Sequence, residues 1–89
     1  MTRLFIRHSV RDYDHWRKSY EAFGAERDLM GVTGAAVFRS ATDPGDVTVW
    51  HDFANLEEAQ AFAGSPKLTQ AMAGAGVTSA PQVWFAEQA

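Results

Sequence analysis

The first segment of the chain alternates between the two sides of an extended backbone. Across residues 3–10, Leu4, Ile6 and His8 fall on one side, and Arg7 falls on the other. A period of two is typical of a β-strand, because successive side chains of a strand point to opposite faces. Residues 3–10 are therefore predicted to form a strand.

The pattern then changes to a helical one. Between residues 13 and 29, large apolar side chains recur every three or four positions, which is the spacing of an amphipathic helix. Asp12 or Asp14 can cap its start, and Gly31 suits its end. The aromatic stripe of this helix consists of Tyr13, Trp16, Tyr20 and Phe23.

A β-hairpin follows. Residues 33–41 and 47–53 both read as strands, and the Asp-Pro-Gly-Asp segment at 43–46 joins them. Proline presets the backbone angle φ of a turn and glycine allows a positive φ, so this segment is a turn with a physical basis. Residues 33–53 are predicted to pair as a hairpin.

The last part of the chain predicts two short helices and a strand. Asn55 is a suitable cap for a helix at 56–63, and Pro66 at a first helical position starts another at 66–73. Residues 82–86 form the final strand. The resulting order is β-α-β-β-α-(α)-β, which predicts an α+β, ferredoxin-like βαββαβ sandwich over residues 1–89 as a single domain.

Both faces of this predicted sheet carry bulky apolar side chains, although helices cover only one face. Trp50 opposes the buried side of its strand, and Trp84 opposes its two apolar neighbours. An antiparallel sheet with one solvated face normally has a polar side. The pattern therefore predicts a second sheet packed on the open face, in a homodimer that forms a dimeric α/β barrel. The alternative is a monomer with scattered surface aromatics.

Composition narrows the classes of function. A chain of 89 residues has a thin core, and without cysteine it has neither disulfides nor thiolate zinc sites to support it, which favours self-association. The net charge of −3 argues against nucleic-acid binding. No apolar run is long enough to span a membrane, and the first residues do not resemble a signal peptide. A cytoplasmic protein is expected.

Three segments resemble the antibiotic-biosynthesis monooxygenase-like proteins of the dimeric α/β-barrel superfamily. They are Val-Arg-Asp-Tyr-Asp-His-Trp at 10–16, Asp-Pro at 43–44, and the run from Ser65 to Val77. The resemblance implies two protomers packed sheet against sheet, with a ligand cavity between each sheet and its helices. It implies activities such as cofactor-independent oxidation of aromatic polyketides, haem degradation or cyclisation. The Asn/Trp/His set of the haem-degrading members has no counterpart that can be placed here.

The candidate catalytic residues are His8 and His51. Both lie about five residues into central strands that we expect to be adjacent and parallel, so the two imidazoles could lie near the same level on the same face of the sheet. The sequence leaves open which face each histidine occupies. Two imidazoles can act as general base and acid near neutral pH. They could also bind a metal, but no third ligand is evident, or serve as structural histidines. We expect no metal site and no cofactor.

Aromatic side chains and one arginine are the candidate substrate-binding residues. The helical stripe could be plain core or the wall of a pocket for a flat ligand. The two strand tryptophans could line that pocket or pack in the dimer interface, and the arginine could anchor a substrate oxygen or face solvent. These residues are Tyr13, Trp16, Tyr20, Trp50, Trp84 and Arg39.

The predicted function is a cofactor-free enzyme, a monooxygenase or a cyclase, that acts on a flat hydrophobic aromatic molecule between sheet and helices. Two alternatives remain open: a non-catalytic small-molecule binding module, and a purely structural or interaction role for the dimer.

Overall fold

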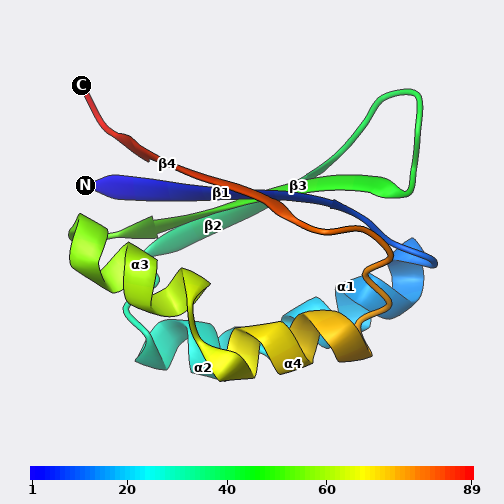
Figure 1. Ribbon diagram of the computed structural model, residues 1–89, viewed down its shortest axis with the longest axis horizontal. Coiled ribbons are helices and arrows are strands. Elements are labelled where there is room, and N and C mark those ends of the chain that lie inside the picture. The colour runs from blue at the N-terminus through cyan, green and yellow to red at the C-terminus, as the bar shows by residue number, and fades with distance from the viewer.

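A four-stranded antiparallel sheet and four helices make up the protein, and the computed structural model describes all 89 residues (Figure 1). All four helices lie on one side of the sheet. In chain order the elements are β1 (Thr2–Ser9), α1 (Tyr13–Ala22), α2 (Gly24–Leu29), β2 (Gly34–Arg39), β3 (Asp46–Phe53), α3 (Leu56–Ala63), α4 (Pro66–Gly74) and β4 (Gln82–Glu87).

The strand order in the sheet is β2-β3-β1-β4, and every neighbouring pair is antiparallel. Helices connect β1 to β2 and β3 to β4, and a hairpin connects β2 to β3. This arrangement confirms the predicted α+β, ferredoxin-like βαββαβ fold. The element bounds agree with the predicted ones within a few residues, except in the first helix.

The prediction that β1 and β3 run parallel is wrong. Because β2 and β3 form a hairpin, β3 runs opposite to β2 and therefore antiparallel to β1. Leu4 pairs with His51, and His8 pairs with Val47. The two histidines are therefore four positions apart along the sheet, roughly 14 Å at the rise of an antiparallel strand, rather than at one level.

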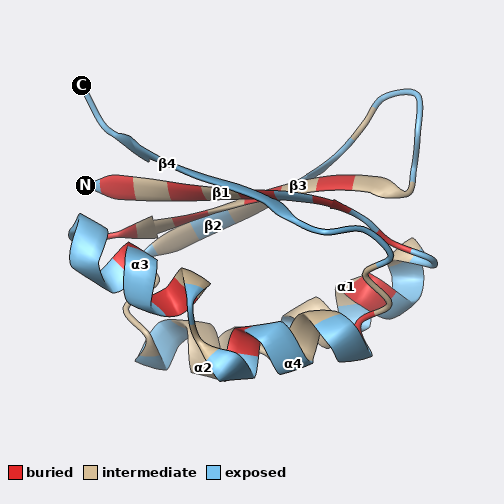
Figure 2. Ribbon diagram, viewed as in Figure 1, coloured by how far each residue is buried: buried red, intermediate tan, exposed pale blue.

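The side chains of the two central strands alternate as the sequence predicts. Leu4 and Ile6 of β1 face the helices with Val49 and Phe53 of β3, and all four are buried. Phe62 of α3 packs on them from the helix side. Figure 2 shows the same alternation as red bands along β1 and β3. The core therefore lies between the sheet and the helices.

The single helix predicted for residues 13–29 is broken into α1 and α2 at Phe23. This residue has φ −84° and ψ 0°, and its N–H donates to the carbonyls of Ser19 and Tyr20, which tightens the last turn of α1. Gly24 follows, and glycine is a weak helix former. The second helix still ends near the predicted glycine, because Gly31 has φ +92°.

Side-chain caps start two of the four helices, α1 and α3, where the sequence placed them, whereas α2 and α4 have no side-chain cap. The Asp12 carboxylate accepts from the backbone N–H groups of Asp14 and His15 and caps α1. The Asn55 side chain accepts from the N–H of Glu58 and caps α3. These bonds satisfy N–H groups that have no partner inside the helix.

The open face of the sheet carries both aromatic side chains and ion pairs. Phe5 stacks on Trp84 with ring centroids 5.1 Å apart, and the Arg3 guanidinium lies 3.7 Å from the centroid of the Trp50 ring. Arg3 pairs with Asp52 at 2.7 Å. Arg7 likewise pairs with Asp46 at 2.7 Å. No helix covers this face.

Candidate functional site

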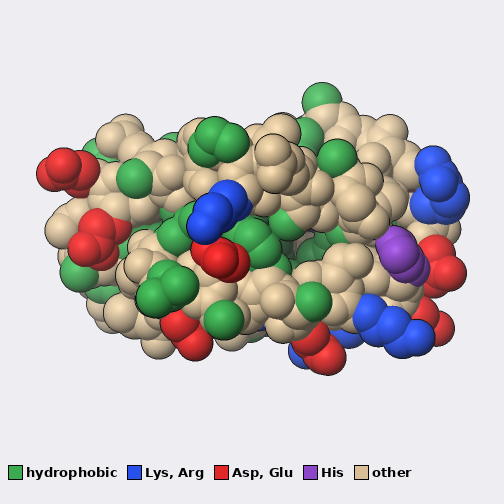
Figure 3. Space-filling view, turned by 90° about the horizontal axis from the view of Figure 1, so that it is seen from below, with side chains coloured by type: hydrophobic (Ala, Val, Ile, Leu, Met, Phe, Trp, Pro, Cys, Tyr) green, Lys and Arg blue, Asp and Glu red, His purple; other side chains and the backbone are tan.

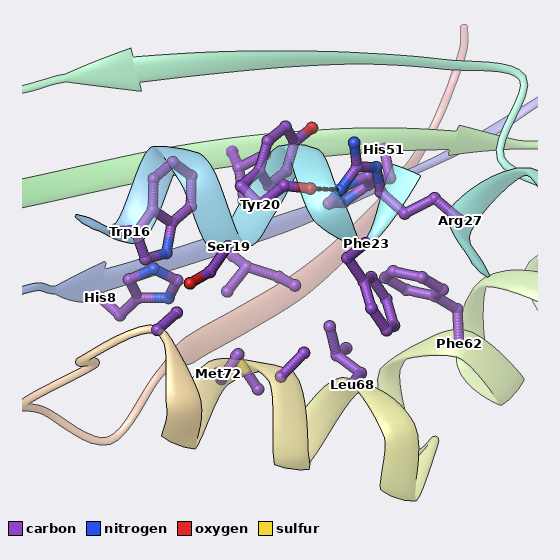
Figure 4. Close-up of a pocket in the computed structure, with 14 residues that line it drawn as sticks. His8, Trp16, Ser19, Tyr20, Phe23, Arg27, His51, Phe62, Leu68 and Met72 are labelled. Carbon is purple, nitrogen blue, oxygen red and sulfur yellow. Dashed lines mark hydrogen bonds between the residues drawn. The ribbon is translucent and has the colours of Figure 1, made fainter. Parts of the chain in front are cut away.

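A cavity of about 40 Å³ lies between the helix-facing side of the sheet and the helices (Figure 4). Ile6 and Val49 form its floor on the sheet, and Phe62 and Leu68 close it from α3 and α4. Fourteen residues line it, ten of them hydrophobic. The cavity is therefore a mainly apolar space with a few polar groups.

The helices that cover the cavity leave a seam between them. Seen from the helix side, apolar side chains lie exposed along the seam between the helices, with a basic and an acidic side chain side by side over it (Figure 3). Lys67 of α4 pairs across to Glu26 of α2 at 3.2 Å. The cavity is closed by side chains of separate helices rather than by one rigid element.

His8 and His51 both line the cavity and are almost fully buried, with exposed fractions of 4% and 2%. His8 meets the edge of the Trp16 ring at 5.8 Å between centroids, and His51 lies 5.1 Å from the Phe62 ring. None of their four ring nitrogens has a hydrogen-bond partner. A buried polar atom without a partner costs free energy. These four nitrogens are therefore free to form hydrogen bonds with a polar ligand or with water inside the cavity.

The two imidazoles differ in their electrostatic surroundings. Burial alone lowers the pKa of His8. Burial, reinforced by the positive charge of Arg27 and opposed by Asp52, lowers the pKa of His51 from 6.5 to about 4. At neutral pH both rings are therefore uncharged, and each offers one N–H donor and one acceptor nitrogen.

Two of the predicted substrate-binding residues, Trp16 and Tyr20, line the cavity. Their rings stack at 5.0 Å between centroids on the face of α1 that points to the sheet. Burial raises the pKa of the Tyr20 hydroxyl, although Arg27 and Arg17 oppose this effect. The stripe is thus both core and cavity wall.

The other four predicted substrate-binding residues do not line the cavity. Tyr13 stacks on the outer side of Trp16 at 5.8 Å, and the Arg39 guanidinium lies 4.0 Å from the Tyr13 ring centroid. Trp50 and Trp84 point to the open face of the sheet, because they pair with residues whose side chains also point there. Because successive side chains of a strand point to opposite faces, these two tryptophans and the two histidines lie on opposite sides of the sheet.

Sequence reasoning did not single out Arg27, which is the only lysine, arginine, aspartate or glutamate among the residues that line the cavity. It lines the cavity, its guanidinium lies 3.8 Å from the Tyr20 ring centroid, and its Nη1 donates to the Tyr20 carbonyl. A signal was present, since Arg27 continues the three-and-four spacing of the aromatic stripe seven residues after Tyr20. The other lining residues that sequence reasoning did not name as a pocket wall are Ile6, Ser19, Val49, Phe62, Leu68, Ala71, Met72 and Ala75.

Comparison with solved structures identifies the architecture. An antibiotic biosynthesis monooxygenase matches with a TM-score of 0.75 and 11% identity, covering 100% of this chain and 99% of the other. SnoaB, a cofactor-independent oxygenase from Streptomyces nogalater, matches with a TM-score of 0.75 and 12% identity, covering 99% and 94%. This chain has the antibiotic biosynthesis monooxygenase fold.

The same fold extends to a conserved protein from Methanosarcina mazei Go1, with a TM-score of 0.75 and 10% identity, covering 99% of this chain and 92% of that one. No protein-family model and no curated protein sequence matches the chain. The likeness to antibiotic biosynthesis monooxygenases is therefore one of fold, as the three sequence segments had indicated.

The structure also shows whether side chains could hold a metal ion and whether a helix could span a membrane. No group of three or more histidine, aspartate or glutamate side chains is placed to hold a metal ion. None of the helices has both the length and the apolar character needed to cross a lipid bilayer.

Proposed function

We propose that this protein is a cofactor-independent enzyme that oxygenates a small, flat, hydrophobic aromatic molecule in the cavity between sheet and helices. The observation that carries the proposal is the set of four unpartnered ring nitrogens of His8 and His51 in an otherwise apolar wall. A substrate with polar groups would satisfy them, and its ring would replace the contacts that an empty apolar space lacks. The fold shared with SnoaB agrees with this chemistry.

His8 is the residue we assign as general base. Its pKa is lowered by burial alone, whereas the Arg27 charge weakens His51 further as a proton acceptor. His8 takes a proton from an acidic phenol or C–H bond and leaves an electron-rich anion. In the oxygenase, a carbon of this anion reduces O₂ and bonds to it, and the resulting peroxide takes the proton back from His8 and loses water, so one oxygen atom stays in the product as a carbonyl and the other leaves as water. In the cyclase alternative, a carbon of the anion attacks a carbonyl of the same molecule, and His8 returns the proton to the new alkoxide. A dry apolar cavity protects such an anion from water. His51 then serves as the neutral hydrogen-bonding partner of the substrate.

The size of the cavity limits the substrate. A buried water needs about 10–15 Å³ of this kind of space, and a cavity that binds benzene has about 150 Å³, so 40 Å³ corresponds to about three waters and is smaller than a single aromatic ring. Sites for drug-sized ligands have about 300–1,000 Å³. Even a single-ring substrate therefore needs α4 to move away from α2, which breaks the Lys67–Glu26 pair, and a fused multi-ring substrate needs a larger movement.

The proposal includes a homodimer that buries the open face of the sheet. Phe5, Trp84 and Trp50 give this face an apolar centre that no helix covers. The dimer would leave the cavity on the opposite side of the sheet accessible from the helix seam. The two functions of the sheet, assembly and ligand binding, would then use different faces.

A second candidate, a non-catalytic binding module, is favoured by one observation. Catalytic histidines are usually oriented by a hydrogen bond to the second ring nitrogen, and neither imidazole has such a partner here. The same cavity would then hold a ligand without transforming it.

Oxygen uptake in the presence of single-ring phenols and hydroquinones tests the enzyme proposal. We expect uptake above the spontaneous rate, reduced about 100-fold or more in His8→Gln, because a positioned general base contributes about 10²–10⁴. His15→Gln, which changes an exposed histidine, is the matched control. Thermal stabilisation by a ligand without any uptake would support the binding module instead.

A further inference from the structure

Arg27 is the one charged residue among those that line the cavity. It projects from α2 and is half-buried, with one face of its guanidinium against the Tyr20 ring and Nη1 bonded to the Tyr20 carbonyl. Figure 4 shows it beside His51 at one end of the cavity, with His8, Trp16 and Ser19 at the other end. An arginine has five N–H donors, and the protein uses one of them here.

No carboxylate neutralises this charge. The protein has four ion pairs, and Arg27 takes part in none of them. On the neighbouring helices, Glu26 pairs with Lys67 and Glu21 pairs with Arg17. The other acidic side chains of these helices form no ion pair with Arg27; they are Asp14, Asp28, Glu57 and Glu58. Asp52 pairs with Arg3 on the opposite face of the sheet. The cavity thus has a positive end without a counter-ion.

The fold does not need this guanidinium for its own hydrogen bonds. The Tyr20 carbonyl, which accepts from Arg27, also accepts from the N–H of Phe23 at 3.2 Å. The contact with the Tyr20 ring uses one face of the guanidinium, and the N–H donors in its plane other than the one bonded to the Tyr20 carbonyl have no partner in the protein. A planar guanidinium binds planar oxyanions through two parallel hydrogen bonds, and these bonds are stronger in a low-dielectric space than in water.

We propose that the cavity binds its ligand as an anion, with an oxyanion on a single aromatic ring held by Arg27. This inference rests on the small-molecule site proposed above and assigns the chemical class of its ligand, an aromatic carboxylate or phenolate. The oxyanion lies at the Arg27 end beside the uncharged His51 N–H, and the ring lies against Val49, Ile6 and Phe62. Arg27 is then a substrate-binding residue that also favours the ionised form of the substrate.

Two matched ligands separate charge from shape. Benzoate and benzamide have the same ring and nearly the same size, and differ in charge. We expect the wild-type protein to bind benzoate about tenfold to hundredfold more tightly, the range given by a hydrogen bond to a charged group. In Arg27→Gln this preference disappears, and Arg27→Lys restores part of it. Arg17→Gln, which removes a cation of α1 that does not line the cavity, keeps the preference. Isothermal titration calorimetry measures all of these affinities.

A phenol tests the second source of the same oxyanion. Bound 4-nitrophenol should ionise at lower pH than the free compound in the wild-type protein, which its phenolate absorbance reports, and should not do so in Arg27→Gln. Equal binding of benzoate and benzamide, unaffected by Arg27→Gln, would overturn the anion proposal and leave the small-molecule site standing. Binding of none of the three compounds to the wild-type protein would overturn both.

Discussion

At His51, burial and charge act in the same direction. The low-dielectric surroundings disfavour a charged imidazole, and the Arg27 guanidinium adds electrostatic repulsion. Asp52 opposes both effects weakly, because its side chain points to the other face of the sheet and pairs with Arg3. One strand position thus decides that His51 stays neutral, although an acidic residue follows it in the sequence.

This neutrality predicts a loss of stability in acid. Between pH 6.5 and about 4 the unfolded chain binds a proton at His51 that the folded protein does not bind, so the free energy of unfolding decreases as the pH falls through this interval. Each tenfold difference in proton affinity is worth about 1.4 kcal/mol, and the His51 contribution is therefore at most about 3 kcal/mol. Urea denaturation at a series of pH values measures it.

Replacing the imidazole isolates this contribution. His51→Gln keeps a neutral polar side chain and should lose this part of the pH dependence, leaving the smaller part that comes from His8. His15→Gln should retain the wild-type profile, because His15 is exposed. A wild-type free energy of unfolding that stays constant from pH 6.5 to 4 would contradict the assignment.

Phe62 couples the core to the cavity. It is 1% exposed and packs on both Phe53 and His51, with centroid distances of 5.4 and 5.1 Å. We expect Phe62→Ala to lower the free energy of unfolding by about 3–5 kcal/mol, the usual cost of truncating a buried phenylalanine. Leu29→Ala, at an 81% exposed position, should cost much less. Chemical denaturation compares the two, and equal losses would show that Phe62 is not part of the core.

At the scale of elements, local patterns predicted what local interactions decide. The alternation of Leu4 and Ile6, the Asn55 cap and the positive φ at Gly31 are all determined within a few residues, and all were predictable. The break at Phe23 was not, because Phe23 fits the apolar stripe of a continuous helix. The helix breaks because the last turn of α1 is tightened, and the spacing of apolar residues along the chain does not predict such a turn.

The same limit applies to the site. Sequence reasoning placed His8 and His51 on one face of the sheet, which is right, but at one level, which is wrong, because strand direction follows from topology rather than from local pattern. Arg27 went unrecognised because a charged residue on a helix is usually exposed, and its spacing does not report that the side chain folds over the Tyr20 ring. The histidines that the sheet contributes to the candidate site were thus predicted from the sequence, whereas only some of the side chains that the helices contribute were predicted.

The start of α1 offers a test at this scale. Asp12 caps the helix that positions Trp16 and Tyr20, so Asp12→Ala should lower the free energy of unfolding by about 1 kcal/mol. Asp12→Asn should be nearly neutral, since asparagine caps helices as well as aspartate does. Thermal or urea denaturation of the three proteins gives the comparison. A large loss in Asp12→Asn would indicate that the charge, and not the cap, is what stabilises α1.

At the scale of the whole molecule, the sheet divides the protein into two sides with different chemistry. The helix side holds the cavity with its two neutral histidines and one arginine. The open side presents the stacked Phe5–Trp84 pair, Trp50 and exposed Phe38, flanked by the Arg3–Asp52 and Arg7–Asp46 pairs. An apolar centre with a charged rim is the usual composition of a protein–protein interface.

The proposed homodimer makes the last prediction. Trp84 is 43% exposed in the single chain and stacks from the edge strand β4 on Phe5 of the central strand β1, so a charge there would be buried against the partner sheet without compensation. We expect the wild-type protein to have the mass of a dimer in size-exclusion chromatography with light scattering, and Trp84→Glu to shift it to the monomer. Leu29→Glu, which adds the same charge on the helix side, should leave the dimer intact. A wild-type monomer would show that this face is not an interface between copies, and the small cavity would then have to function in the isolated chain.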